Sequence, residues 1–536
     1  MIFKERFKKN FINFNRKIFK RKEYQKNIIL TEFNAFQPFH VSTSIASNYL
    51  AKKYSARIIA FYNYALVVSP LRKNLFNKVK WYLGIFFGLK KFGIYKSFGV
   101  SEFISPIMQY KNIDSIVRAI YNSIHNKNDI IKIKLYGIII GDLLNDSYIK
   151  YFKTYTVDYK SKKFYNYLRD FIYLFFYWKD YIDKNREKIK CIIGCHAVYA
   201  YGLPLRIAIF NGIRVICIIN GQVFNLTKKR PFANSEYLDF KKKFKLIAPK
   251  EKKLGLLKAK KSLIDRFKGR TGLKINDLFF PKSSFNPKYK SKKKVLNSNK
   301  NIKVLIAAHE VHDAATPLGP NFFSDFYEWM LFLMKISKLT NYDWYLKNHP
   351  TQEKLKLIQN QQITMNITSL LLKKFPNIRS IDPNIPHNQL IREGIDFVLT
   401  VRGTVAIEYA YAGIPVLIAT KSNFTRPYTF NKHFKNKDDY KKQLLNLDKF
   451  KMTIKKTEVL QHFFMRFIYT RYSDFMPFFE EFNKINKNFD KYFTDDFYEF
   501  YINRITKTNF NLLNVITRRF ENFYNSNDYI LGRDHF

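Results

Sequence analysis

A short polar break between two apolar runs is the part of the sequence best suited to bind a phosphate. An apolar, β-branched run at 397–401 precedes the break at 402–404, and a one-sided helical run at 405–412 follows it. A small loop at a helix N-terminus, behind a parallel strand, presents backbone N–H groups that hold an anion. Glu408 lies one turn further on, where a carboxylate reaches a ribose. The unit predicts a nucleotide-binding site that includes Arg402, Gly403 and Thr404.

A histidine followed by a proline comes directly after another predicted strand, 343–347. Pro350 disfavours helical backbone at His349 and keeps that residue extended, so we expect the imidazole to meet a phosphate or a base. Lys347 is expected to turn to the same place. The alternative is a histidine that merely ends a strand at the surface.

His309 follows a third predicted strand, 303–307, and begins a cluster that also contains His312. The cluster invites interpretation as a metal site. Its histidines lack the i, i+4 helical spacing of zinc proteases and no third ligand is evident, so no metal is expected. We interpret it as a polar loop that brings His309 close to the nucleotide.

Three residues of the first half are candidates for a general base that removes a proton from an acceptor hydroxyl. Asp142 is the first choice, because it follows a predicted strand, 134–140, beside Gly141. Glu32 and His40 belong to the loop after the first predicted strand and are its rivals. The alternative for Asp142 is that it caps the turn that follows.

Other polar residues of the first half are candidates for binding the acceptor. His196 follows a predicted strand at 190–194. Lys228 and Arg230 form a basic run suited to a phosphate-bearing acceptor. A solvated charge run has the same composition, so that alternative stays open.

Strands and helices alternate in both halves of the chain, which predicts parallel sheets with helices on both faces. At 536 residues the chain is too long for one ordinary core. We expect two doubly wound Rossmann-type domains facing a cleft, with ligands at the carboxyl ends of the strands. The expected segments are a basic amphipathic N-terminal segment (1–26), an N-terminal α/β acceptor domain (27–281), a linker (282–301), a C-terminal α/β nucleotide domain (302–434) and a helical C-terminal extension (435–536).

The formal net charge of +52 suggests an anionic partner: nucleic acid, an anionic membrane or a phosphorylated substrate. The excess is mostly Lys, and Lys is abundant together with Asn, Ile, Phe and Tyr, the set that an AT-rich genome favours. Composition bias therefore accounts for much of the charge. No known nucleic-acid-binding module is evident, so nucleic acid is not an expected partner.

The N-terminal segment and the cysteines bear on location. Phenylalanines recur at helical spacing among Lys and Arg in 1–26, which is typical of a helix lying on an anionic membrane or packed on its own domain. No signal peptide and no membrane-spanning run is recognised. An odd number of cysteines in or beside apolar strands favours a reducing cytosol. We expect a cytoplasmic protein, with peripheral attachment to the inner face of the cytoplasmic membrane left open; the cysteines are Cys191, Cys195 and Cys217.

The stretch from about 302 to 420 resembles the capsule polysaccharide biosynthesis family, which includes bacterial Kdo transferases. The resemblance is carried by His349-Pro350, by the stretch 382–390 before a helix, and by 400–408 with Gly413 and Pro415 behind it. Members are GT-B glycosyltransferases whose C-terminal domain holds a sugar nucleotide, often a CMP-sugar. The resemblance implies that the His-Pro pair, the loop and its Glu408 bind the donor.

Two departures from the family pattern are visible. The family loop carries a Ser or Thr pair where this chain has Arg402-Gly403, which adds a positive charge and leaves CMP and UDP both open as the nucleotide. Retaining transferases of this fold often place two glutamates eight positions apart, and residue 400 is Thr. We therefore expect an inverting, metal-independent glycosyltransferase of capsule or lipopolysaccharide type, with no cofactor besides its nucleotide-sugar donor and with a glycan or lipid-linked acceptor.

Rival functions remain on the same sequence. A polyol-phosphate transferase of teichoic-acid type would take CDP-glycerol, and a sugar-nucleotide epimerase would need no acceptor. A basic nucleic-acid-binding protein would bind polynucleotide with a steep salt dependence and ignore free nucleotide. A non-catalytic assembly factor would bind nucleotide without turnover.

Overall fold

The computed structural model describes residues 2–19, 26–34, 37–62, 75–89, 91–106, 113–219, 221–270, 283–285, 293–319, 321–348, 358–470, 475, 481–482, 485–486, 491, 494–508 and 510–532. The chain divides into two compact units, each with its own sheet. Unit 1 consists of Met1–Ser147, Tyr159–Ala233 and Arg471–Phe536, and unit 2 consists of Tyr148–Asp158 and Asn234–Thr470.

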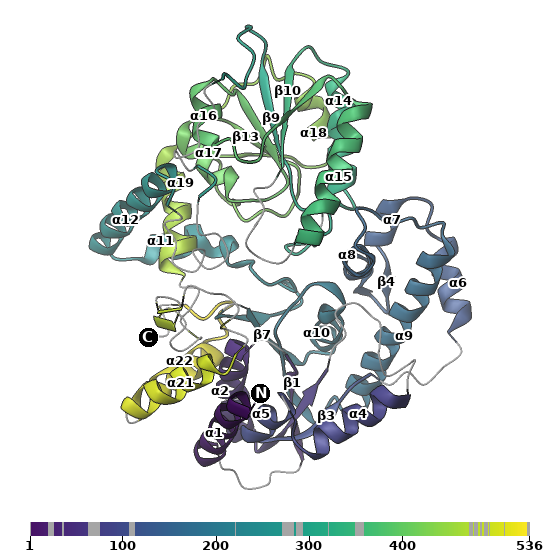
Figure 1. The fold of residues 1–536 in the computed structure, drawn as a ribbon, viewed down its shortest axis with the longest axis vertical. Helices are drawn as coiled ribbons and strands as arrows, with labels where there is room; N and C mark the ends of the chain where they lie inside the picture. Colours follow the sequence, from purple (N-terminus) through teal and green to yellow (C-terminus); the bar gives the residue numbers. More distant parts are fainter. Residues whose placement is uncertain are drawn as a thin grey trace. The chain divides into compact units, whose positions relative to one another are not determined.

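Unit 1 is built on a six-stranded sheet in the order β3-β2-β1-β6-β7-β8 (Figure 1). The pairings from β3 to β7 are parallel, and β8 is antiparallel to β7. Apolar, β-branched runs suit these strands because helices cover both faces of a parallel sheet. The bounds are β1 Asn27–Glu32, β2 Ala56–Phe61, β3 Val100–Ile104, β6 Ile189–Gly194, β7 Arg214–Ile219 and β8 Gln222–Leu226.

The helices of unit 1 include two from the end of the chain. Aromatic pairs join α22 to α2, with the ring centroids of Tyr49 and Phe520 5.6 Å apart. The bounds are α1 Ile2–Ile18, α2 Gln37–Lys53, α4 Leu75–Phe86, α5 Lys91–Ser97, α6 Asp114–Asn122, α7 Lys127–Ile131, α8 Gly141–Phe152, α9 Lys162–Lys184, α10 Gly202–Phe210, α21 Asp496–Lys507 and α22 Asn511–Ser526. The part of α8 from Tyr148 onward belongs to unit 2.

The strand predicted at 134–140 is wrong. This segment forms a small antiparallel hairpin, β4 (Lys134–Leu135) and β5 (Ile138–Ile139), outside the main sheet. Tyr136 and Gly137 both have positive φ, 50° and 78°, which is the backbone of a two-residue hairpin turn. Apolar periodicity alone cannot distinguish such a folded-back run from a straight buried strand.

Unit 2 is built on a second six-stranded sheet, all parallel, in the order β11-β10-β9-β12-β13-β14. This is the doubly wound order 3-2-1-4-5-6 of dinucleotide-binding folds. The predicted strands at 303–307 and 343–347 are confirmed. The bounds are β9 Lys303–Ala307, β10 Asp343–Lys347, β11 Ile378–Ile381, β12 Phe397–Thr400, β13 Val416–Ile418 and β14 Lys432–His433.

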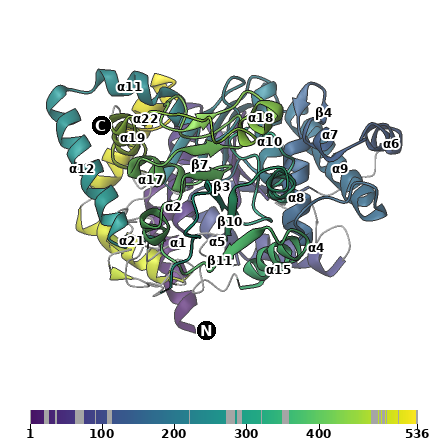
Figure 2. The same cartoon turned by 90° about the horizontal axis from the view of Figure 1, so that it is seen from above.

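The helices of unit 2 include α11 and α12, which precede its first strand. Figures 1 and 2 both show α12 beside α19, and an added Cβ at Gly255 would clash with the Phe464 ring. The bounds are α11 Phe240–Leu246, α12 Pro249–Phe267, α14 Phe326–Ser337, α15 Ile358–Lys374, α16 His387–Arg392, α17 Val405–Ala412, α18 Lys437–Leu444 and α19 Lys456–Phe464.

The structural division differs from the one expected from sequence. Residues 234–281 belong with unit 2, and the described part of the predicted linker contributes Phe285 and Leu296 to the core of that unit. The predicted helical extension is split, since 435–470 belongs to unit 2 and 471–536 to unit 1. The division into two units is set by apolar contacts between residues far apart in the sequence. The polar composition of 282–301 gives no sign of those contacts.

The apolar face of α1 packs within unit 1. Phe11 is fully buried, with its ring centroid 4.3 Å from that of Tyr498, and Phe14 contacts Tyr501 and Phe510. Of the two alternatives for this segment, these contacts support packing on its own domain. Among the described residues, no helix is long and apolar enough to cross a bilayer.

Candidate functional site

The centre of each sheet is a topological switch point, where neighbouring strands send their connections to opposite sides and ligands of doubly wound folds bind. In unit 2 the switch lies between β9 and β12. His309 follows β9 and Arg402 follows β12, so the sheet itself brings together two of the predicted residues.

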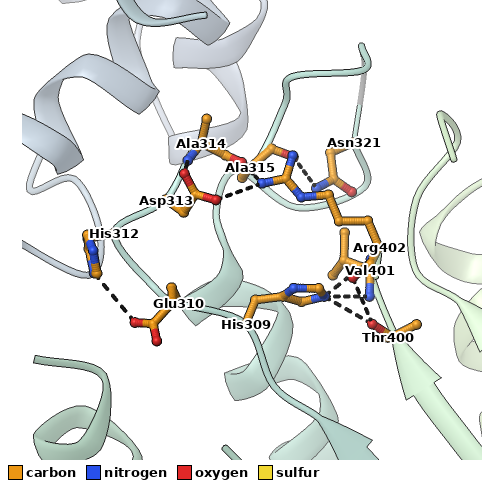
Figure 3. A network of polar contacts seen from close by, with 10 residues as sticks. All are labelled: His309, Glu310, His312, Asp313, Ala314, Ala315, Asn321, Thr400, Val401 and Arg402. Atoms are coloured by element: carbon orange, nitrogen blue, oxygen red, sulfur yellow. Dashed lines mark hydrogen bonds and ion pairs between the residues drawn. The ribbon is translucent and has the colours of Figure 1, made fainter. Parts of the chain in front are cut away.

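His309 holds the loop after β12 in place (Figure 3). Its Nε2 lies 3.0 Å from Thr400 Oγ1 and accepts the backbone N–H groups of Val401 and Arg402 at 3.3 and 3.2 Å. The ring stacks on Phe326, with centroids 4.6 Å apart. Because Nε2 is committed to the loop, His309 shapes the site through this nitrogen.

The loop leaves backbone donors available at the start of α17. Gly403 has a φ of +147°, a conformation that residues with a Cβ rarely adopt. Among the described residues, none accepts a hydrogen bond from the backbone N–H of Gly403, Thr404 or Val405. Three such donors at the positive end of a helix form an anion-binding site.

Glu408 is buried and held by an arginine from α12. Its side chain forms an ion pair with Arg266, whose Nε donates to Oε1 at 2.6 Å. The same guanidinium lies 3.4 Å from Thr404 Oγ1, so it also borders the N-terminus of α17. The two side chains are 10% and 3% exposed. Arg266 therefore places a carboxylate and a fixed positive charge beside the free N–H groups.

Arg402 turns to a different neighbour from the one expected. Its Nη2 donates to the carbonyl of Ala314 and lies 3.3 Å from Asp313 Oδ2, and its guanidinium lies 5.3 Å from the centroid of Phe326. Figure 3 shows the contacts with Asp313 and Ala314, on the loop after β9. The positive charge at 402 is thus paired with Asp313, and the cation next to the helix N-terminus is Arg266.

Lys347 does not reach an open site. It is 2% exposed, and its ammonium donates to the carbonyls of Asp382 and Pro383. Burial lowers its pKa to about 8. The structure therefore corrects the expectation for Lys347, which anchors the chain before α16. His349 and Pro350, predicted to bind the nucleotide, lie outside the described residues.

In unit 1 the switch lies between β1 and β6, and Glu32 occupies the end of β1. Glu32 is 3% exposed, and its Oε2 accepts the backbone N–H of Cys195 at 2.6 Å. Among the described residues, Oε1 has no hydrogen-bond partner although it is buried. An unpaired buried carboxylate oxygen is costly and requires an explanation, and a catalytic role is one such explanation.

The surroundings of Glu32 make it a proton acceptor near neutral pH. Burial raises the pKa of its carboxyl to about 7, while hydrogen bonds from Cys195 and the charge of Lys91 oppose that shift. Burial also lowers the pKa of Lys91 to about 8. A carboxylate poised near pH 7 in an apolar site is suited to general base catalysis.

The side chains of the other two candidate bases already form contacts within the fold. Asp142 lies in the first turn of α8 and forms a buried bidentate ion pair with Arg206, with oxygen–nitrogen distances of 2.5 and 2.6 Å. His40 contacts the Tyr498 hydroxyl and the Asn34 carbonyl through its two ring nitrogens, at 2.6 and 2.7 Å. The structure thus corrects the first choice, Asp142, because its carboxylate already has a charged partner.

The predicted acceptor-binding residues fall into two places. His196 follows β6, and its ring stacks on Tyr201 with centroids 6.1 Å apart, beside the backbone that binds Glu32. Lys228 and Arg230 belong to the turn after β8, where they lie over the rings of Phe210 and Tyr529. His196 shares the strand-end edge of Glu32, which supports a place near the acceptor.

The possible metal ligands are spread out. In the described part of the chain, no group of three or more His, Cys, Asp or Glu side chains is suitably placed for a metal ion. His312 lies 3.9 Å from Glu310, and burial lowers its pKa to about 4. The three cysteines are free and buried, as predicted for strand cysteines.

Sequence reasoning missed Arg266 and Lys91. Each reaches its glutamate from a segment with no recognisable motif, and Arg266 is 142 positions from Glu408. The only sequence signal is a buried glutamate in an apolar run, which requires some compensating partner. That signal predicts a positively charged partner but does not identify the residue that provides it.

Comparison with known proteins gives a likeness to solved structures. No family model and no curated protein matches the chain. A glycosyltransferase from Rickettsia africae aligns with a TM-score of 0.25 at 12% identity, covering 86% of this chain and 99% of that one. A UDP-GlcNAc 2-epimerase from Neisseria meningitidis bound to UDP-GlcNAc gives 0.19 at 12%, covering 82% and 97%. The wall teichoic acid polymerase TagF gives 0.20 at 13%, covering 94% and 99%.

These scores are too low to carry an argument about this chain. Its class rests on its own strand orders, which define two doubly wound α/β units.

Proposed function

We propose that the protein is an inverting glycosyltransferase of GT-B type, which moves a sugar from a nucleotide-sugar donor to a surface polysaccharide or glycolipid acceptor. The observation that carries the proposal is the N-terminus of α17, where three backbone N–H groups have no acceptor among the described residues and lie beside the Arg266–Glu408 pair. Fold alone does not imply function, so the site must bear the argument.

Unit 2 binds the donor in this proposal. The N–H groups of Gly403, Thr404 and Val405 receive the phosphate, and the helix dipole adds to their attraction. Glu408 accepts a ribose hydroxyl through its second oxygen, while Arg266 keeps the first oxygen in place. The same N–H groups stabilise the charge that grows on the phosphate as the sugar leaves, which is the larger part of catalysis in such transfers.

Unit 1 binds the acceptor and supplies the base. Glu32 takes the proton from an acceptor hydroxyl through its unpartnered Oε1. The hydroxyl oxygen forms a bond to the anomeric carbon, the bond from that carbon to the phosphate oxygen breaks, and its electron pair stays on the nucleotide. A single displacement with one base inverts the anomeric configuration. These steps use no metal ion.

A nucleotide screen tests the donor half of the proposal. Thermal unfolding is followed with CMP, CDP, UDP and GDP at saturating concentration, since a ligand that binds only the folded state raises the melting temperature. We expect one pyrimidine nucleotide to stabilise the protein, and Gly403→Val to lose that effect. No shift with any nucleotide would contradict the proposal.

Turnover then distinguishes the enzymes that share this architecture. The labelled sugar nucleotide that matches the screen is incubated with lipid and glycan fractions, and labelled product is separated. Transfer to a glycan or glycolipid supports the proposal. Conversion of the sugar nucleotide without an acceptor would instead assign an epimerase, and transfer from CDP-glycerol alone would assign a polyol-phosphate transferase.

A further inference from the structure

One helix of unit 1 exposes a continuous apolar face, which we name the α4 surface. It lies on α4 and the turn behind it. Phe76, Leu83 and Phe86 recur at helical spacing and therefore share one face. Its members and their exposed fractions are Phe76 68%, Val79 47%, Tyr82 57%, Leu83 48%, Phe86 77%, Phe87 65% and Leu89 53%. Contiguous exposure of this kind marks an interaction site.

The opposite face of α4 is firmly packed, so the exposure is not a sign of a loose helix. Trp81 contacts the rings of Phe33 and Phe92, with centroids 5.9 and 4.9 Å apart. An added Cβ at Gly84 would lie 2.8 Å from the Phe92 ring, which shows how closely the helix approaches α5. The amphipathic helix thus has one packed face and one face whose apolar side chains are largely exposed.

The segment of sequence that contains the α4 surface is basic. The sequence from Phe33 to Ser101 contains ten Lys and Arg and no Asp or Glu. Lys80 is exposed on α4, and the Lys96 ammonium lies 3.4 Å from the Phe86 carbonyl, at the edge of the apolar face. A partner for this surface must be apolar in its interior and anionic at its boundary.

We infer that the α4 surface docks the protein on an anionic lipid bilayer. Phe and Leu side chains insert at the boundary between headgroups and acyl chains, while lysines contact the anionic headgroups. Each lysine near such a surface adds to the attraction, and the effect decreases with salt.

The docking surface is joined to the proposed catalytic edge of unit 1. Trp81 of α4 packs on Phe33, the residue directly after Glu32. Lys91 of α5 interacts with Glu32 and lies 4.1 Å from the centroid of the Phe33 ring. The inference therefore deepens the proposed function, on which this step rests: the acceptor is a lipid-linked glycan presented at the bilayer surface.

A second exposed apolar set in unit 2 provides a matched control. Leu254 and Leu257 on α12 are 52% and 57% exposed, and lysines surround them. This helix also carries Glu251 and Asp265, which repel anionic lipid. With six Lys and one Arg, α12 is more basic than α4, which has two Lys, so the control removes similar exposed apolar side chains from a helix with more positive charge.

The test is vesicle co-sedimentation of the full chain. Vesicles contain equal parts of phosphatidylglycerol and phosphatidylcholine, or phosphatidylcholine alone. We expect binding to the anionic vesicles that decreases with salt. The triple variant Phe76→Ser, Phe86→Ser, Phe87→Ser should bind at least about tenfold more weakly, because each buried aromatic contributes strongly to transfer. Lys80→Glu should weaken binding roughly fivefold or more. Leu254→Ser, Leu257→Ser should bind like the wild type.

Three outcomes would overturn the inference. They are no vesicle binding by the wild type, equal loss in the α12 control, or concentration-dependent self-association that the triple variant abolishes without affecting vesicle binding. Nucleotide stabilisation is measured on every variant. If the wild type binds nucleotide but not vesicles, the docking inference fails and the proposed function stands. If it binds vesicles but no nucleotide, the proposed function fails and the docking surface stands.

Discussion

The strand-end edges of the two units have the same topology and opposite chemistry. Each lies at a switch point between two central parallel strands, β1 and β6 in unit 1 and β9 and β12 in unit 2. The edge of unit 2 offers backbone N–H groups and a glutamate already paired with Arg266. The edge of unit 1 offers a glutamate whose buried Oε1 has no hydrogen-bond partner in the part of the chain that the structure describes.

The difference shows that the fold determines the location of a site and that side-chain partners determine its role. Glu32 and Glu408 are 3% and 2% exposed, so burial alone does not separate them. A guanidinium neutralises Glu408 and leaves it fit to accept hydrogen bonds. Glu32 has no such partner among the described residues; it accepts the backbone N–H of Cys195, and burial raises its pKa to about 7.

The largest expected effect comes from removing the base. Glu32→Gln should lower the transfer rate by about 10²- to 10⁴-fold, because that is what a positioned general base contributes. The affinity for nucleotide should not change, since the site of unit 2 is intact. In the wild type, kcat/KM should fall as pH decreases below about 7. A rate for Glu32→Gln close to that of the wild type would contradict the assignment of Glu32 as the base. The proposed difference between the strand-end edges of the two units would then fail.

The second prediction compares two buried ion pairs. Arg266→Ala leaves Glu408 buried without a partner and should destabilise the protein by about 3–5 kcal/mol. It should also weaken nucleotide binding, and Arg266→Met combined with Glu408→Leu should recover stability without recovering binding. The measurements are denaturant unfolding and calorimetry.

The control for this prediction is the Asp142–Arg206 pair of unit 1, which is similarly buried. Arg206→Ala should destabilise the protein to a similar degree, and the remaining folded protein should bind nucleotide like the wild type. Equal loss of binding in both variants would mean that the effect of Arg266 is only structural.

The third prediction concerns stability and pH. The folded-state pKa of Glu32 is about 7, above its ordinary value of 4.5, so the folded state binds the proton more tightly. Its contribution to stability is present below pH 4.5 and is lost as pH rises to about 7. The free energy of unfolding of Glu32→Gln, taken relative to that of the wild type, should therefore increase by on the order of 3 kcal/mol between pH 4.5 and pH 8.

A control of opposite sign is available for this measurement. Hydrogen bonds from Thr429 and Lys241 lower the pKa of Glu458. Its stabilisation is present above the unfolded pKa and lost as pH falls, so Glu458→Gln should be less stable than the wild type at pH 8. A pH-independent difference for Glu32→Gln would contradict the raised pKa.

The sequence predicted the framework of these edges well. The strands at 303–307 and 343–347 and the helix at 405–412 match the structure, because buried parallel strands and a glycine-stopped helix leave clear local patterns. The prediction of the nucleotide loop also depended on local signals, since Gly403 lies in the short polar break after an apolar run.

The partners of the charged residues were beyond the reach of the sequence. Asp142 pairs with Arg206 at a separation of 64 residues, and Arg402 turns to Asp313 rather than to the helix N-terminus. Such pairings depend on which helices pack together, and a single sequence does not contain that information. The role of an ionisable residue therefore needs the tertiary structure.

The smallest expected effect distinguishes the two arginines of unit 2. Arg402→Gln should change nucleotide affinity by less than about threefold, because its half-exposed partner Asp313 makes this a surface ion pair. Thermal stability should barely change. A loss of tenfold or more would show that Arg402 faces the phosphate, as the sequence predicted, and would weaken the assignment of Arg266.

The central claim is that the nucleotide binds at the start of α17 and that Glu32 acts separately from it. Calorimetric titration of the best nucleotide into the wild type, Gly403→Val, Gly394→Ala and Glu32→Gln tests this most directly. Gly394 also has positive φ, 90°, but lies in open space, so its variant controls for backbone strain. We predict that only Gly403→Val loses binding. Retained binding in Gly403→Val, or loss in Glu32→Gln, would contradict the claim.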